Sequence, residues 1–237
     1  MKLKTLWLEL RLVLFGRGWL EKSLTGNALL QQRTFDTGRD VKMCVRRQTL
    51  GPTGRRVIAV NTPDRWIQYN VRDPGSINDN IAECLSMCQP GPHAFLMVVP
   101  LGPSKGKEWT VEGPLALLSD RIWKNTIVVF TKPERLKGIP IEDYVAQRKF
   151  LGPLMDRCGR RHHLLDTSVY GHESQVEGLL EKIDAMVEEN KTLTDVWVSN
   201  GFFIEENRDE MERKVKRRPS EVQASRRVLR SLTGQYY

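Results

Sequence analysis

The strongest constraint on the fold is a pair of short segments that carry almost no polar side chains. Residues 94–101 are all apolar, and in residues 126–130 the one polar side chain is that of Thr126. Strands of this kind have no polar face, so other elements must cover both of their faces, as in a largely parallel sheet. The sequence therefore predicts an α/β protein.

Helical patterns alternate with the other apolar runs. Further strands are predicted at residues 6–15, 57–60 and 162–165, and helices at residues 23–30, 77–87, 111–119, 141–151 and 174–187. This alternation predicts a doubly wound, mostly parallel sheet with helices on both faces. In such sheets, ligands bind beyond the carboxyl ends of the strands.

The charge of the chain is concentrated in its last residues. The net charge is +8, and residues 211–237 hold eight Lys/Arg and two Glu, which gives 8 − 2 = +6. We expect one domain at residues 8–190 and a charged, net basic helical or partly disordered tail at residues 191–237. The tail can be a solvated helix, a helix that binds a partner or a second copy, or a segment attracted to anionic membrane surfaces. It has no interleaved aromatic residues, so nothing indicates nucleic-acid binding.

The chain has 237 residues, and nothing in it predicts export or a membrane span. No stretch approaches the ~20 consecutive apolar residues of a membrane helix, and the first residues do not have the pattern of a signal peptide. We expect a cytoplasmic protein. The four cysteines, Cys44, Cys84, Cys88 and Cys158, have no zinc-site spacing and are interpreted as reduced, buried thiols.

A phosphate-loop pattern lies between the first predicted strand and the first predicted helix. Residues 16–23 match G-x-x-x-x-G-K-[ST] except at Glu21, where the pattern has glycine. In this motif, backbone N–H groups surround the phosphates, the lysine balances their charge and the serine hydroxyl ligates Mg²⁺. Lys22 and Ser23 are the corresponding residues here.

A second motif resembles a particular family. Residues 85–99, with Pro90-Gly91-Pro92-His93 before a buried strand, are similar to the box that distinguishes the immunity-associated GTPases (GIMAP/IAN, AIG-type G domain) from other Ras-like proteins. Residues 24–30 and 179–187 resemble the first and last helices of that family. The resemblance implies a Ras-like P-loop GTPase fold. We expect His93 to be structural, fixing the turn before the strand.

The resemblance also implies a site for GTP or GDP. The segment after the strand at 126–130 corresponds to the guanine-reading motif, and the segment after His163 to the last base-contacting loop. The implied nucleotide-binding residues are Gly16, Gly18, Lys22, Ser23, Leu24, Thr131, Lys132, Glu134, Asp166 and Thr167. Ser23 is the implied metal ligand, and no catalytic residue is identified.

Several positions depart from the family pattern, and most of them lie on the phosphate side. Glu21 places a carboxylate where the loop needs glycine, and a positive φ there would be strained. Its charge would repel a phosphate unless it turned to solvent or met Arg17. Asn61 replaces the carboxylate that holds the Mg²⁺ shell, Asp64 replaces a glycine, and Val41 aligns with the switch threonine. We therefore expect a weakened Mg²⁺ site and slow or absent hydrolysis.

Three functions remain open at this stage. The first is a guanine-nucleotide-binding switch or scaffold, which by resemblance would form a homodimer, or pair with a related G-domain protein, through its nucleotide face. The second is a pseudo-GTPase that binds no nucleotide and acts through protein contacts. The third is a GTPase completed by a group that a partner supplies. Trp19, inside the loop, can either cover a nucleotide or fill an empty site.

Overall fold

The computed structural model describes residues 8–16, 18–40, 42–50, 54–63, 84–102, 120–168 and 173–190. The chain divides into two compact units, residues 1–199 and 200–237, and every described residue belongs to the first. Arg17, Val41 and Asp64 lie outside the described residues, as do the predicted helix at 111–119 and the tail. The predicted boundary at residue 190 therefore stays a prediction.

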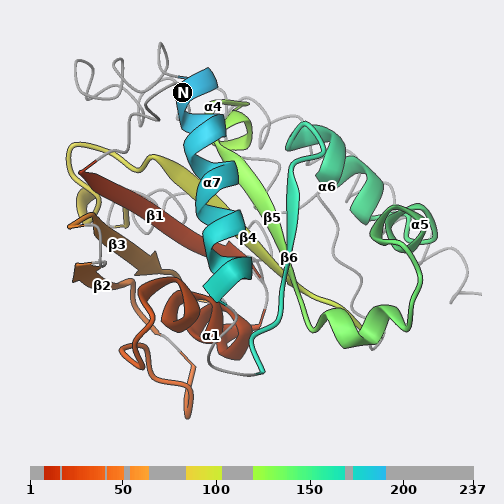
Figure 1. Ribbon diagram of the computed structural model, residues 1–237, viewed down its shortest axis with the longest axis horizontal. Helices are drawn as coiled ribbons and strands as arrows, with labels where there is room; N and C mark the ends of the chain where they lie inside the picture. The colour runs from red at the N-terminus through yellow and green to blue at the C-terminus, as the bar shows by residue number, and fades with distance from the viewer. Residues whose placement is uncertain are drawn as a thin grey trace, which may run out of the picture. The chain divides into compact units, whose positions relative to one another are not determined.

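The strands of the described part form one sheet (Figure 1). Its order is β2 (Val45–Leu50), β3 (Arg56–Asn61), β1 (Glu9–Gly16), β4 (Ala94–Pro100), β5 (Thr126–Thr131) and β6 (His162–Leu165). Every neighbouring pair is parallel except β2 and β3. The mostly parallel α/β sheet predicted from the apolar runs is confirmed.

Helices cover both faces of the sheet, as expected. Alternate residues of β1, from Leu10 to Leu14, pack in one core with residues of α1 (Trp19–Leu30) and α7 (Glu173–Glu189). The intervening positions face the other side, where Phe15 packs edge-on against Phe95 and Trp123. Trp123 belongs to α4 (Asp120–Lys124), which lies near α6 (Leu151–Arg157).

Four features differ from the sequence prediction. Strand β2 was missed because it lies at the edge of the sheet and is mostly exposed and basic, so it has no apolar run. The predicted helix at 141–151 is α5 (Ile141–Ala146), a turn, and then α6. A short 3₁₀ helix, η2 (Pro133–Leu136), follows β5. Helix α1 begins at Trp19, four residues earlier than predicted, and this difference affects the candidate site.

The interpretation of all four cysteines as reduced thiols is wrong for two of them. Cys44 and Cys84 form a disulfide bond, with their Cα atoms 5.8 Å apart, within the usual range. It joins the segment before β2 to the segment before β4. Cys88 and Cys158 are free and buried, and burial raises the pKa of each thiol to about 12.

An ion pair between buried Arg55 and half-buried Asp184 attaches α7 to the start of β3. Arg55 Nη1 donates to Asp184 Oδ2 at 2.9 Å, and Arg55 Nη2 donates to Asp184 Oδ1 at 2.5 Å. Such a two-pronged contact fixes orientation as well as distance. No helix in the described part of the chain is both long and apolar enough to span a bilayer.

Candidate functional site

The residues predicted to form the site gather at the carboxyl edge of the sheet. Strand β1 ends at Gly16, which pairs with Val98 of β4 at the centre of the sheet. A Cβ atom at Gly16 would lie 2.3 Å from the carbonyl oxygen of Val98, so only glycine fits there. The neighbouring strands β3, β5 and β6 end at Asn61, Thr131 and Leu165. This edge is where a doubly wound sheet binds its ligands.

The second half of the predicted phosphate loop is helical. Gly18, with φ of 94°, is the N-cap of α1, and the backbone N–H of Lys22 donates to the carbonyl of Gly18 at 3.1 Å. A phosphate cradle needs such N–H groups to be free for a ligand. The replacement of glycine by Glu21 favours the helix, because glycine is about 1 kcal/mol less favourable there. An acidic residue in the first turn adds about 0.3–1 kcal/mol.

The Glu21 carboxylate lies inside the site and joins its parts. Its Oε1 pairs with Lys132 Nζ at 2.8 Å, and its Oε2 accepts from Thr167 Oγ1 at 3.0 Å. Glu21 is only 3% exposed. We call these three residues the Glu21 cluster. The carboxylate does not turn to solvent, and Glu21, in α1, does not have a positive φ. Arg17, the other partner considered from the sequence, lies outside the described residues. Lys132 and Thr167 instead balance it.

The two polar residues after Glu21 are completely buried. Lys22 Nζ donates to the backbone carbonyl of Thr62 at 2.8 Å. Ser23 Oγ accepts from Asn61 Nδ2 at 3.2 Å. Lys22 and Ser23 therefore contact the end of β3, where the resemblance places the switch II motif. These contacts hold α1 against that segment.

The fit for Mg²⁺ is partial. Asn61 Oδ1 is buried and accepts no hydrogen bond, so together with Ser23 Oγ it offers two neutral oxygen atoms. Mg²⁺ is usually bound through one or two carboxylates plus phosphate oxygens. The described residues contain no group of three or more His, Cys, Asp or Glu side chains that could hold a metal. Among the described residues, Ser23 and Asn61 are therefore the ones that could contribute to a metal held mainly by a phosphate.

The segments that the resemblance assigns to the base follow the ends of β5 and β6. Thr131 is buried, and Lys132 follows it in a left-handed conformation with φ of 61°. Glu134 lies in the first turn of η2 with its side chain 60% exposed, and Arg135 Nε lies 3.7 Å from Glu134 Oε1. Asp166 Oδ1 accepts from the backbone N–H of Ser168 at 2.8 Å. Guanine recognition by Glu134 and Asp166 stays a prediction.

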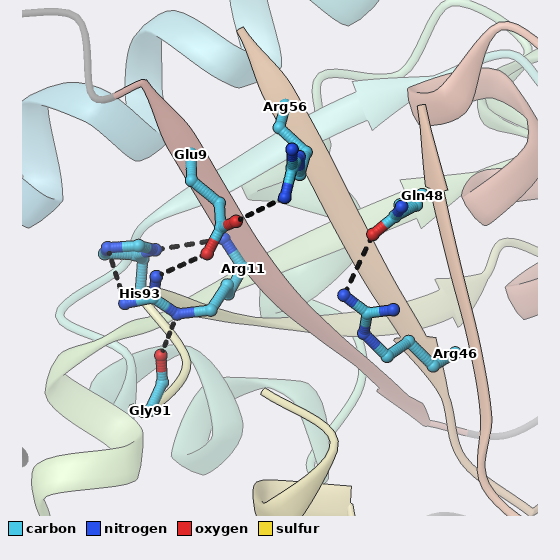
Figure 2. A network of polar contacts seen from close by, with 7 residues as sticks. All are labelled: Glu9, Arg11, Arg46, Gln48, Arg56, Gly91 and His93. Atoms are coloured by element: carbon cyan, nitrogen blue, oxygen red, sulfur yellow. Dashed lines mark hydrogen bonds and ion pairs between the residues drawn. The ribbon is translucent and has the colours of Figure 1, made fainter. Parts of the chain in front are cut away.

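His93 lies at the opposite edge of the sheet, just before β4, and Figure 2 shows its surroundings. Its Nδ1 accepts from the backbone N–H of Arg11 at 2.9 Å, and Arg11 Nε donates to the carbonyl of Gly91 at 2.5 Å. Arg11 Nη1 also pairs with Glu9 at 2.8 Å. Burial, reinforced by the charge of Arg11, lowers the pKa of His93 to about 4. His93 is therefore neutral and fixes the turn before β4, in agreement with the expected structural role.

Comparisons with known proteins identify the family. The AIG1 family profile matches residues 10–216. The chain belongs to the AIG1 family. It is 27% identical over 190 residues to human GTPase IMAP family member 8, covering 77% of this chain and 28% of that protein. It is 30% identical over 191 residues to immune-associated nucleotide-binding protein 9 of Arabidopsis thaliana, covering 76% and 55%. The chain thus spans about a quarter to a half of the length of these curated relatives.

Solved structures support the same fold. Toc33 from Arabidopsis thaliana in complex with Mg²⁺ and GMPPNP superposes with a TM-score of 0.56 at 15% identity, covering 76% of this chain and 85% of that one. A dimerization-deficient mutant of Toc33 has the same TM-score at 14% identity, covering 76% and 84%. At this identity the similarity establishes the fold alone.

For this AIG1 domain, sequence reasoning located the segments of the site but missed how they contact one another. Contact of Lys22 and Lys132 with a ligand stays a prediction. In the structure, Lys22 donates to the Thr62 carbonyl and Lys132 pairs with Glu21. The negative charge of Glu21 was the signal from which its contact with a cation could have been inferred. A glutamate in a glycine position of the loop has to find a cation when it is buried, and Lys132 was already placed at the same edge.

Proposed function

We propose that this chain is a guanine-nucleotide-binding protein of the AIG1 family that acts as a switch or scaffold and hydrolyses GTP very slowly or not at all. One observation carries the proposal. The Glu21 cluster brings together the three segments that the resemblance assigns to the nucleotide: the phosphate loop, the base-reading motif and the last loop. The names of the relatives, a GTPase and a nucleotide-binding protein, support the same ligand.

The chemistry of the site supports binding more than turnover. After release from Thr62, the Lys22 ammonium would lie beside the phosphates and balance their charge. Mg²⁺, when bound, would neutralise charge on the transferred phosphate, and Ser23 and Asn61 are the described residues that could ligate it. Because Asn61 is neutral, the protein contributes little to holding the metal. GTP hydrolysis, the step that depends on the metal, is therefore weakened more than nucleotide binding.

A second candidate function is favoured by the early start of α1. If the first turn of α1 remains helical and Glu21 remains paired, the chain is a pseudo-GTPase that works through protein contacts. For either function we propose the cytoplasm as its location and the nucleotide face as the surface for a second copy or a related G domain. Contact of the basic tail with anionic membrane is a further proposal, supported by charge alone.

The deciding experiment is an equilibrium titration of the purified chain with fluorescent GTP and GDP, with and without Mg²⁺. Lys22→Met is the test variant, because it keeps the volume of a completely buried side chain and removes its charge. Lys182→Met is the matched control, since its ammonium bonds the His162 carbonyl at an exposed position. Binding that is lost in Lys22→Met alone supports a nucleotide-dependent protein. No binding at about 100 μM, a free energy weaker than roughly −5.5 kcal/mol, contradicts it.

A further inference from the structure

The carboxylate of the Glu21 cluster is buried and specifically paired, unlike an ion pair formed by chance at the surface. The Glu21 carboxylate is almost completely removed from solvent, and each of its oxygens has its own partner: Lys132 Nζ at 2.8 Å and Thr167 Oγ1 at 3.0 Å. The partners come from two different loops, after β5 and after β6. A buried carboxylate needs this kind of compensation, so it is well satisfied while the cluster is closed.

From this geometry we infer that Glu21 is the residue that sets the nucleotide affinity of the site, acting as an internal competitor for the groups that a nucleotide needs. The inference rests on the proposed function and concerns the regulation of the same site. It assigns Glu21 a role that the phosphate-loop pattern does not contain. The ligand class is a guanine nucleotide with two or three phosphates.

Two features make the closed cluster and a bound nucleotide compete. Lys132 and Thr167 belong to the segments expected to contact the nucleotide, and both are engaged by Glu21. Glu21 also lies in the first turn of α1, where the Lys22 N–H bonds the Gly18 carbonyl. To present that N–H to a phosphate, the first turn must unwind, and unwinding moves Glu21 away from its two partners.

The charges supply a route for opening the cluster. The phosphates of a nucleotide carry negative charge, which attracts Lys132 and repels the Glu21 carboxylate. The Lys132 side chain is 39% exposed, so an entering anion can reach it before Glu21 moves. Nucleotide entry and opening of the cluster are therefore coupled, and the free chain rests in the closed state.

The test compares nucleotide affinity among Glu21 variants of the full chain. Glu21→Gly restores the glycine of the motif and removes the carboxylate, and Glu21→Gln removes only the charge. Glu142→Gly is the matched control, because it makes the same change in the first turn of α5 at an exposed carboxylate. We expect GDP and GTP to bind at least about tenfold more tightly to Glu21→Gly than to the wild type. Glu21→Gln should show a smaller gain and Glu142→Gly none.

A second measurement tests the closed cluster without nucleotide. Thermal unfolding of Glu21→Gln, Lys132→Met and the double variant should show that the two stability losses are not additive. The double variant should be no less stable than the less stable of the two single variants. Equal nucleotide affinity in wild type and Glu21→Gly, or no coupling between Glu21 and Lys132, overturns the inference and leaves the proposed function standing. Absence of binding in both the wild type and Glu21→Gly overturns the proposed function and this inference together.

Discussion

The side-chain amide of Asn61 donates to the hydroxyl of Ser23 across 3.2 Å, and both residues are completely buried. Ser23 is the residue that the motif assigns to Mg²⁺, and Asn61 occupies the position of the missing carboxylate. The hydrogen bond joins the two positions that the motif and the resemblance associate with Mg²⁺. It pairs the Asn61 amide nitrogen with Ser23 and leaves the Asn61 Oδ1 atom buried without a hydrogen bond.

Asn61→Asp should create a dependence on Mg²⁺. We expect nucleotide affinity of the wild type to change less than about twofold when Mg²⁺ is removed, and that of Asn61→Asp to fall about tenfold, since a carboxylate is the ligand that Mg²⁺ prefers. Titration with fluorescent GDP in Mg²⁺ and in chelator measures both values. Asn61→Ala, which offers no oxygen, is the control. A strong Mg²⁺ requirement in the wild type would show that the metal has other ligands.

The ion pair of buried Arg55 with half-buried Asp184 predicts a large loss of stability when Asp184 is neutralised. Asp184→Asn leaves a buried guanidinium without its counter-charge, and we expect the free energy of unfolding to fall by about 2–4 kcal/mol. Asp156→Asn is the matched control, because its partner Arg160 forms an exposed pair that contributes less than about 1 kcal/mol. Urea unfolding of both variants measures the difference. Equal losses would show that burial does not distinguish the two pairs.

The parts of the fold that the sequence predicted are those in which burial alone determines the structure. The apolar runs of β4 and β5 gave strand bounds within a residue of those observed, because a doubly buried strand has no alternative pattern. Strand β2 could not be found this way, since it lies at an exposed edge and consecutive residues such as Arg46 and Arg47 are both exposed, so it has neither an apolar run nor an alternating pattern. Its position depends on pairing with β3, which is a tertiary contact.

In the candidate site, too, the placement of the segments could be predicted, whereas the contacts between their side chains could not. The phosphate-loop motif placed Lys22 and Ser23, and the family resemblance placed Lys132, at one edge of the sheet, as the structure has them. The partners of these residues could not be predicted from spacing, since Glu21 meets Lys132 only through the order of the strands. The start of α1 was predicted too late because residues 16–23 were interpreted as a phosphate loop. The preference of Glu21 for a helix outweighed the motif.

The disulfide between Cys44 and Cys84 predicts a redox-dependent stability. The two residues are 40 positions apart, and a cross-link of that length contributes about 3–4 kcal/mol by restricting the unfolded chain. Reductant should therefore lower the free energy of unfolding by about that amount. The double variant Cys44→Ala/Cys84→Ala should not respond to reductant, whereas Cys158→Ala should respond as the wild type does.

Alkylation provides the direct check of that pairing. In denaturant without reductant, only Cys88 and Cys158 should react, so mass spectrometry should find two labels, and four after reduction. Four labels before reduction would show that Cys44 and Cys84 are not joined.

His93 predicts the response of the fold to acid. Burial and the charge of Arg11 lower the pKa of His93 from 6.5 to about 4. The unfolded chain therefore takes up a proton at a higher pH than the folded chain, and stability falls as pH decreases from about 6.5 to about 4. The full loss in the free energy of unfolding from this group is about 3 kcal/mol.

His93→Asn keeps a side-chain acceptor near the N–H of Arg11 but cannot be protonated, so unfolding curves at pH 7.5 and 4.5 should differ less for the variant. A smaller slope remains from His163, whose pKa burial and Lys182 also lower. Identical pH dependence in wild type and His93→Asn would show that His93 does not hold this turn as a neutral acceptor.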